Sequence, residues 1–210
     1  MPTALIWGAS GGIGRALVEQ HIAQGWTVYG AARQVDNIPD RVAQRFSFDA
    51  SKLSSFQEVA LLLAHEIDAL DRVIYAAGGI QYTKVLELGQ QNWHNMMNVN
   101  LHGAYYSIES TLPLMREGGT FVVLGAYPEK ITLPRFGAYA SAKAALQPMM
   151  EILAKEQRKH IFRLMRLPAV NTPFWNALPI KVPEYALSPS VAAERILNAL
   201  NHEEQVVIDL

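Results

Sequence analysis

Tyr139 and Lys143 are the two side chains of this sequence whose types and spacing best suit proton transfer. They lie in a segment with a helical pattern, where residues four apart share one face of the helix. An ammonium group beside a phenol stabilises the phenolate, so we expect the pKa of Tyr139 to fall from about 10 toward the working range. A phenol tuned in this way can donate a proton to a carbinol oxygen or take one from it. Because such a spacing also arises by chance, the pair needs support from a second motif.

A glycine-rich turn, Gly8–Gly14, supplies that support. It directly follows the apolar segment Ala4–Trp7 and opens the helical pattern Gly12–Gln24. Glycines let a backbone turn tightly and approach a pyrophosphate, and the N-terminus of the next helix offers free N–H groups and a positive dipole. The alternative is an ordinary surface turn, but the position after a first strand favours dinucleotide binding. The residues expected to meet the phosphates are Gly8, Ser10, Gly11, Gly12, Ile13 and Gly14.

The end of the second expected strand, Tyr29–Arg33, indicates which dinucleotide is bound. NAD sites usually carry an acidic residue there, which holds the ribose 2′-hydroxyl. This segment has no acid and ends in Arg33, whose guanidinium suits a 2′-phosphate. We therefore expect NADP(H), with NAD(H) as the alternative, and leave open that Arg33 is only a solvated strand-end residue. Asp49, after the third expected strand, belongs either to the adenine pocket or to an ordinary helix N-cap.

The composition excludes several classes of protein. The chain has 210 residues, a formal net charge of −1 and no cysteine, and 50% of it is hydrophobic. Wholesale disorder, a disulfide framework and cysteine chemistry are therefore excluded. The near-neutral charge gives no reason to expect nucleic acid or an anionic membrane as a partner. No apolar run approaches the roughly 20 residues that span a bilayer, and no basic leader precedes the first strand, so we expect a cytoplasmic protein.

Short apolar runs alternate along the chain with longer amphipathic segments. Seven runs predict strands: Ala4–Trp7, Thr27–Ala31, Arg45–Phe48, Arg72–Tyr75, Thr120–Leu124, Ile161–Leu167 and Gln205–Ile208. Five segments predict helices: Gly12–Gln24, Leu53–Leu70, Asn92–Met115, Ala138–Lys159 and Pro189–Asn201. Runs that are apolar almost throughout are typical of strands buried on both faces of a parallel sheet. We therefore predict one α/β domain, residues 1–210, with a Rossmann-type doubly wound parallel sheet of about seven strands and helices on both faces.

Two connections depart from this alternation. The stretch from Arg33 to Gln44 holds only 12 residues, too few for a full crossover helix. The segment 172–187 contains three prolines, which disfavour a helix or a central strand. It follows a buried strand at the carboxyl edge of the sheet, where open α/β folds bind ligands. We expect it to be a substrate lid, with Phe174 and Trp175 lining an apolar pocket.

With three further segments, these motifs resemble the short-chain dehydrogenase/reductase family over essentially the whole chain. The further segments are Ala77–Gly78 after the fourth strand, Asn98–Gly103, and Pro168 followed by Val170, Thr172 and Pro173.

The resemblance implies a role for each of these residues. Tyr139 is the general acid/base, Lys143 binds the nicotinamide ribose and lowers the tyrosine pKa, and Asn100 holds a water of the proton relay. Val170 and Thr172 meet the nicotinamide carboxamide. The remaining cofactor contacts are expected from Arg33, Asp49, Ala77, Gly78 and Pro168.

The sequence departs from the family pattern at several points, and Pro168–Ala169 in place of the usual P-G is one of them. Two other departures lie close to the expected site. Ala126 stands thirteen positions before Tyr139, where the family usually carries a serine that holds the substrate oxygen. Alanine donates no hydrogen bond, and losing one well-placed donor can cost roughly 10²–10³ in rate; Tyr127 or Thr132 could replace it. The usual N-N-A-G motif reads Tyr75–Gly78, so a structural amide is absent.

The alanine is also where the chain resembles dihydropteridine reductases, which keep the Tyr/Lys pair and place alanine after a glycine at this point. Reduction of their quinonoid pterin forms no alkoxide, so the missing donor matters less. Their cofactor preference goes with an acid on the second strand, where this chain has Arg33. We therefore predict an NADP(H)-dependent short-chain oxidoreductase acting on a small carbonyl or related substrate. The alternatives are a quinonoid reductase of the dihydropteridine type and a dinucleotide-binding sensor with little turnover.

No metal site is expected, since the closest pair among the six histidines, His94 and His102, lies about two helical turns apart. The expected partner is a small-molecule substrate. Family members commonly pair through the long helix after the fourth strand and the tyrosine-bearing helix, so the resemblance implies a homodimer or homotetramer.

Overall fold

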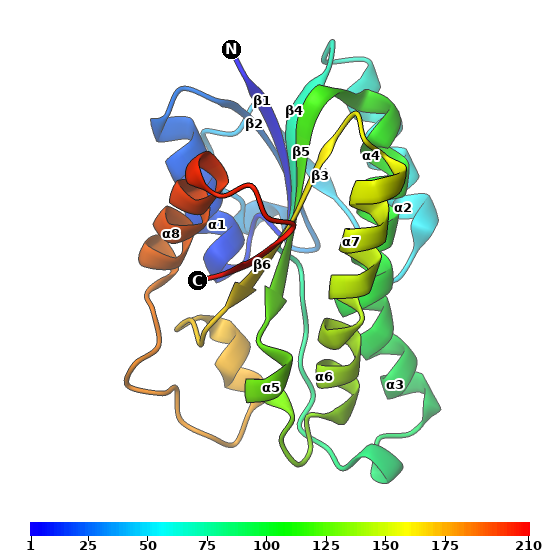
Figure 1. Cartoon of the computed structure of the whole chain (residues 1–210), viewed down its shortest axis with the longest axis vertical. Helices are drawn as coiled ribbons and strands as arrows, with labels where there is room; N and C mark the ends of the chain where they lie inside the picture. The colour runs from blue at the N-terminus through cyan, green and yellow to red at the C-terminus, as the bar shows by residue number, and fades with distance from the viewer.

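A single sheet of seven parallel strands forms the centre of the computed structural model, which describes all 210 residues (Figure 1). The strands are β1 (Thr3–Trp7), β2 (Thr27–Ala32), β3 (Gln44–Ser47), β4 (Leu70–Tyr75), β5 (Met115–Ala126), β6 (Ile161–Leu167) and β7 (Val207–Asp209). Their order across the sheet is β3-β2-β1-β4-β5-β6-β7. Successive strands are added outward from β1 on one side as far as β3 and then from β4 on the other side, so the strand order reverses between β1 and β4. The predicted Rossmann-type architecture is confirmed. A crevice at this switch point is where open α/β sheets bind ligands.

The α-helices are α1 (Gly12–Ala23), α2 (Leu53–Ala64), α3 (Gln90–Met97), α4 (Gly103–Thr111), α5 (Pro128–Ile131), α6 (Gly137–Ala144), α7 (Leu146–Glu156) and α8 (Pro189–His202). The pair α1 and α8 covers one face of the sheet, while α2, α4 and α7 cover the other (Figure 1). None of the helices is long and apolar enough to cross a membrane.

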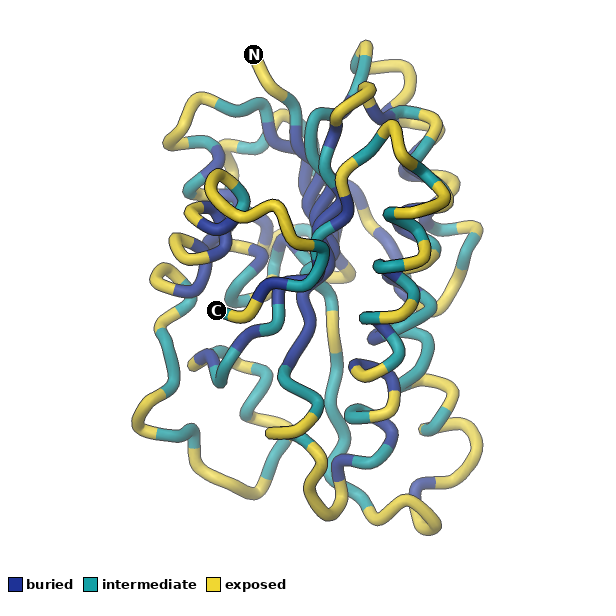
Figure 2. The backbone as a smooth tube through the Cα atoms, viewed as in Figure 1, coloured by how far each residue is buried: buried dark blue, intermediate teal, exposed yellow.

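Side chains that alternate along each strand divide the core into two layers. Leu5 and Trp7 of β1 pack toward α2 and α4, whereas Ile6 packs toward α1 and α8. Both layers are apolar, which explains why the strands read as nearly continuous hydrophobic runs. Figure 2 shows the resulting buried centre between helices whose outer faces are exposed. Trp7 also lies against Phe48 and Phe56, with ring centroids 5.0 and 4.7 Å apart.

Three predicted helices were too long. The segment expected over Leu53–Leu70 ends as a helix at Ala64, and β4 begins at Leu70 itself. Asn92–Met115 is not one helix, because a π-helical stretch at Asn98–His102 separates α3 from α4. Ala138–Lys159 is divided between α6 and α7 at Ala145. Apolar periodicity continues through such interruptions, so the pattern alone did not reveal them.

The two irregular connections are as predicted in outline. Between β2 and β3 the chain forms only the short 3₁₀ helix Val35–Asn37. Segment 172–187 contains the 3₁₀ helix Pro173–Ala177 and otherwise has no regular structure. Its base is closed by two backbone hydrogen bonds, Asn171 N–H to Leu187 O and Leu187 N–H to Ala169 O, at 2.8 and 2.9 Å. The segment is therefore a loop whose ends are held beside the end of β6.

His21 is a fully buried histidine on the inner face of α1. Its Nδ1–H donates to the Leu17 carbonyl at 2.7 Å, which leaves Nε2 to accept from the Arg72 guanidinium at 3.2 Å. Burial is the main cause that lowers its pKa from 6.5 to about 4, and the nearby Arg72 charge lowers it further. The imidazole is therefore neutral at neutral pH.

This neutral histidine makes stability fall in mild acid. Between pH 6.5 and 4 the unfolded chain binds a proton at His21 that the folded chain does not, so the free energy of unfolding should fall by about 3 kcal/mol across this window. Urea unfolding at several pH values measures the slope. His21→Gln should flatten the slope, whereas the exposed control His65→Gln should keep it. An unchanged slope in His21→Gln would remove His21 as its origin.

Candidate functional site

A cavity of about 1050 Å³ lies beyond the carboxyl ends of the strands. It brings together every residue predicted for the site except Asp49. The predicted residues that line it are Gly8, Ser10, Gly11, Gly12, Ile13, Gly14, Arg33, Ala77, Gly78, Asn100, Tyr139, Lys143, Pro168, Val170 and Thr172. β1, β2 and β4 end at the same level, since Trp7 pairs with both Ala31 and Tyr75. The loops that follow them therefore meet around one space.

The glycine turn forms one wall of this cavity. Gly8 has a φ of +84°, which favours glycine, and a Cβ there would lie 2.6 Å from the Ala77 nitrogen. A Cβ on Gly12 would lie 2.5 Å from the Thr172 side chain, so this residue too must stay small. The helix α1 that follows has no capping side chain and no acidic residue in its first turn. The turn therefore offers a narrow backbone cradle at a helix N-terminus, which suits a pyrophosphate.

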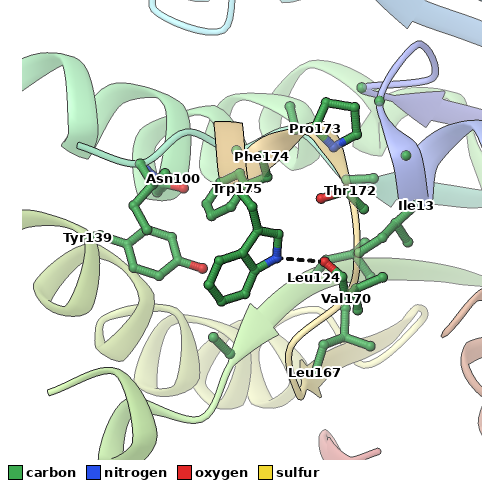
Figure 3. Close-up of a pocket in the computed structure, with 18 of the residues that line it drawn as sticks. Ile13, Asn100, Leu124, Tyr139, Leu167, Val170, Thr172, Pro173, Phe174 and Trp175 are labelled. Atoms are coloured by element: carbon green, nitrogen blue, oxygen red, sulfur yellow. Dashed lines mark hydrogen bonds between the residues drawn. The ribbon is translucent and has the colours of Figure 1, made fainter. Parts of the chain in front are cut away.

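Tyr139 and Lys143 both lie on α6 and line the same cavity. Figure 3 shows Tyr139 facing the side of the cavity where Ile13 lies. The Lys143 Nζ donates to the Leu124 carbonyl at 2.8 Å and lies 6.0 Å from the centre of the Tyr139 ring. Burial lowers the pKa of Lys143 to about 8 and raises that of Tyr139 above its ordinary value. The expected lowering of the tyrosine pKa is thus wrong for this structure, because desolvation of the phenolate outweighs an ammonium at this distance. Tyr139 is a protonated phenol at neutral pH.

Asn100 is buried within the π-helical stretch and holds the loop after β4. Its Nδ2 donates to the carbonyls of Gly79 and Met96 at 2.9 and 3.0 Å, and its Oδ1 accepts from the Gly79 N–H at 3.2 Å. Both amide hydrogens are used in these contacts, and Oδ1 keeps one acceptor position. If Asn100 binds a relay water, its side chain can only accept a hydrogen bond from that water.

Tyr75 stands where the family usually has an amide, and the structure gives its phenol a structural role. The buried hydroxyl donates to the Val99 carbonyl at 2.7 Å, which ties the end of β4 to the π-helical stretch. A Cβ on Gly103, the first residue of α4, would collide with this hydroxyl. The sequence pattern indicates only the missing amide at this position. Gly103, which lies 28 residues after Tyr75 and leaves room for its phenol, is the signal that could have revealed this contact.

Ala126 lines the cavity at the end of β5, and neither hydroxyl expected to replace the missing serine is free to donate there. The Tyr127 hydroxyl donates to the Leu210 carbonyl at 2.9 Å. The Thr132 hydroxyl donates to the Pro128 carbonyl at 2.7 Å, and Thr132 does not line the cavity. Both candidates are therefore engaged elsewhere.

Segment 172–187, the expected lid, lines the cavity with two aromatic residues, Phe174 and Trp175, as Figure 3 shows. The Trp175 indole N–H donates to the Val170 carbonyl at 2.8 Å. Phe174 lies against Tyr139, with ring centroids 5.8 Å apart. The indole thus uses one of the two acceptor positions of the Val170 carbonyl, in a residue expected to meet the nicotinamide. The sequence predicts that Trp175 belongs to a lid, but it does not predict this contact.

Arg33 and Asp49 lie at the far end of the site. Arg33 is exposed, makes no ion pair, and lines both the main cavity and a smaller one of about 550 Å³. Asp49 lines only the smaller cavity, and its carboxylate accepts from the Ser51 N–H and hydroxyl at 3.0 and 2.7 Å. These hydrogen bonds lower the pKa of Asp49. Its carboxylate therefore stabilises the turn before α2 and does not reach the main cavity, which Phe48 and Ala50 line instead.

Comparison with known proteins identifies similar sequences and structures. The sequence model of the family described as short chain dehydrogenase matches residues 2–179. Among solved structures, an alcohol dehydrogenase from the archaeon Thermococcus sibiricus, complexed with 5-hydroxy-NADP, has a TM-score of 0.89 and 27% identity. The match covers 100% of this chain and 96% of that one.

Curated relatives include proteins with several different names. An uncharacterized oxidoreductase of Staphylococcus aureus is 25% identical over 98% of this chain and 94% of its own length. A fatty acyl-CoA reductase of Acinetobacter baylyi is 28% identical over 94% of this chain and 72% of its length. A cyclic-di-GMP-binding biofilm dispersal mediator protein of Escherichia coli is 28% identical over 73% of this chain and 66% of its length, so the chain spans just under two thirds of that relative.

The contact between Tyr75 and Gly103 predicts a measurable coupling. Gly103→Ala should lower the free energy of unfolding because the new Cβ collides with the Tyr75 hydroxyl. In a Tyr75→Phe background the same change should cost less, with a coupling energy of about 1 kcal/mol or more. Urea unfolding of the wild type, both single variants and the double variant gives this value. Additive effects would show that the two residues do not constrain each other.

Proposed function

The chain belongs to the short-chain dehydrogenase family and is an oxidoreductase, and from that premise we propose that it is an NADP(H)-dependent reductase of a small carbonyl compound. In this proposal Tyr139 is the general acid. The observation that carries it is one cavity in which a glycine cradle at a helix N-terminus faces a protonated tyrosine and a buried lysine. These parts come from segments far apart in the sequence, and the fold places them around the same space.

The cofactor would lie along the cavity from Arg33 to Tyr139. The glycine turn would hold the pyrophosphate on backbone N–H groups, and Arg33 would pair with the 2′-phosphate at the end of β2. Lys143 would hydrogen-bond the nicotinamide ribose. The bound nicotinamide supplies the hydride. The NADP analogue in the Thermococcus relative supports the choice of NADP(H) over NAD(H).

Tyr139 would donate its hydroxyl proton to the substrate oxygen during reduction. A phenol whose pKa is raised by burial is fully protonated at neutral pH, so it is ready to act as an acid. Lys143, with a pKa of about 8, is still mostly charged at neutral pH and would stabilise the phenolate left behind. Both groups are therefore in the protonation state that reduction requires.

The lid and the cofactor would share one acceptor. The Val170 carbonyl already accepts from the Trp175 indole, and the nicotinamide carboxamide would donate to the second lone pair of the same oxygen. Nicotinamide binding and the position of segment 172–187 are therefore coupled in this proposal.

A quinonoid reductase is the second candidate, and Ala126 is the observation that favours it. Tyr127 and Thr132 both donate to backbone carbonyls, so the site has no hydroxyl in the serine's place to stabilise an alkoxide. Reduction of a quinonoid ring forms no alkoxide and does not need that donor. Parallel assays with aromatic carbonyls and a quinonoid dihydropterin separate the two candidates.

Replacing the tyrosine tests its role as the acid. Tyr139→Phe should reduce turnover by at least about 100-fold, because the proton donor is lost. The affinity for NADPH, measured by nicotinamide fluorescence, should change little. Tyr185→Phe, at an exposed lid residue that also lines the cavity, is the matched control and should keep most of the activity. Retained turnover in Tyr139→Phe would exclude Tyr139 as the general acid.

Reversing the charge at Arg33 tests the choice of cofactor. Arg33→Asp should weaken NADPH binding by about 10-fold or more and improve the relative affinity for NADH, since one ion pair is replaced by a repulsion. Arg41→Asp makes the same charge change at an exposed arginine outside the cavity. It should leave the NADPH to NADH preference as it is. An unchanged preference in Arg33→Asp would mean that the 2′-phosphate is recognised elsewhere.

A further inference from the structure

All the charges that line the main cavity have one sign. Its charged lining residues are Arg33, Lys130, Lys143 and Lys181, and no aspartate or glutamate is among the lining residues. The chain as a whole has 18 basic and 19 acidic residues, so an excess of cations here does not follow from the composition. Cations that share a cavity with poorly polarisable walls reinforce one another and attract anions.

The cofactor accounts for only half of these cations. Arg33 lies at the adenine end and Lys143 beside Tyr139, as the proposed function requires. Lys130, at the end of α5, and Lys181, in the lid loop, line the part of the cavity formed by α5 and the lid. Neither makes an ion pair, whereas Lys52, Lys84 and Lys159 each have an acidic partner.

The acidic residues nearest to Lys130 are bound to another partner. Arg166 holds both carboxylate oxygens of Asp209, at 2.5 and 2.6 Å, and also lies 3.9 Å from Glu129. Lys130 instead lies over the face of the Tyr127 ring, 4.1 Å from its centre. This cation–π contact holds the ammonium beside the end of β5. Arg166 holds the Asp209 carboxylate and is the main cause that lowers its pKa; Lys130 lies near enough to lower that pKa further, but it makes no ion pair with Asp209.

Apolar side chains from α5, the segment that follows it and the lid line the same cavity. They are Ile131, Leu133, Phe136, Phe174, Trp175, Leu178 and Ile180. A ligand complementary to the apolar side chains and the two lysines has an apolar body and a negatively charged end.

We propose that the substrate is a carbonyl compound with an apolar body and a carboxylate or phosphate group, and that Lys130 and Lys181 bind this anionic group. The inference rests on the proposed function, since it places the carbonyl at Tyr139. The two lysines are specificity residues: they bind the ground state and the transition state alike, so their loss raises KM and leaves kcat nearly unchanged.

Unreactive ligands of matched shape test the proposal directly. Isothermal titration of the NADPH-saturated protein with 4-methylbenzoate and with neutral 4-methylbenzamide should show the anion binding about 10-fold tighter or more. 4-Methylphenyl phosphate distinguishes a site for phosphate from one for carboxylate. Added salt should shrink the preference, because ions screen charges beyond about 10 Å at 0.1 M.

Lysine variants then assign the preference to the two residues. Lys130→Gln and Lys181→Gln should each reduce it, and the double variant should abolish it. Lys155→Gln, at an exposed unpaired lysine of α7 outside the cavity, should keep it. With 4-carboxybenzaldehyde as substrate, the loss should appear in KM.

Equal binding of the acid and the amide, binding of neither, or a preference that survives in the double variant would overturn the proposal. The saturating NADPH titration that precedes each experiment separates this failure from a failure of the proposed function. A protein that binds NADPH but shows no anion preference contradicts only the substrate class. A protein that does not bind NADPH contradicts the reductase itself.

Discussion

The backbone of the glycine turn passes the end of β4 so closely that no side chain fits between them. Gly8 adopts a left-handed φ of +84°, and its missing Cβ would lie 2.6 Å from the Ala77 nitrogen. This approach sets where α1 begins and aims its uncapped N-terminus into the cavity. It also places the loop after β4 against the π-helical stretch. There the Asn100 side chain accepts from the Gly79 N–H and donates to the Gly79 carbonyl. The rest of the site depends on this close approach, because it positions both the glycine turn and the loop after β4, which lie on two sides of the cavity.

Two residues near this close approach, Tyr75 and Gly103, compensate for each other's departure from the usual side-chain size. The family's amide at the end of β4 is replaced by Tyr75, a larger side chain that still has one hydrogen-bonding group. Its phenol reaches the Val99 carbonyl and needs Gly103 to make room. The hydrogen bond satisfies the buried Tyr75 hydroxyl, which would otherwise lack a partner, and this is worth about 1 kcal/mol or more. The altered motif is therefore compatible with a well-ordered site.

Desolvation determines the electrostatics of the cavity. It moves the pKa of Tyr139 up and that of Lys143 down, so both groups shift toward their neutral forms. Lys143 keeps its ammonium beside the Leu124 carbonyl without a carboxylate partner. The absence of acidic residues among the cavity's lining residues lets the site accept polyanionic ligands without repulsion.

Several features were determined by the sequence alone, because they depend on local patterns. The strand–helix alternation, the glycine turn and the Tyr139/Lys143 spacing each involve residues that are close in the chain, and they were sufficient to predict the fold class and the family. Other features depend on which distant residues share a space. The raised pKa of Tyr139 follows from burial by segments far along the chain, the role of Tyr75 from its contact with Val99 and Gly103, and the engagement of Tyr127 from its reach to Leu210. Periodicity and spacing carry no information about such contacts, since desolvation and hydrogen-bond pairing depend on three-dimensional proximity. Only the tertiary structure could decide them.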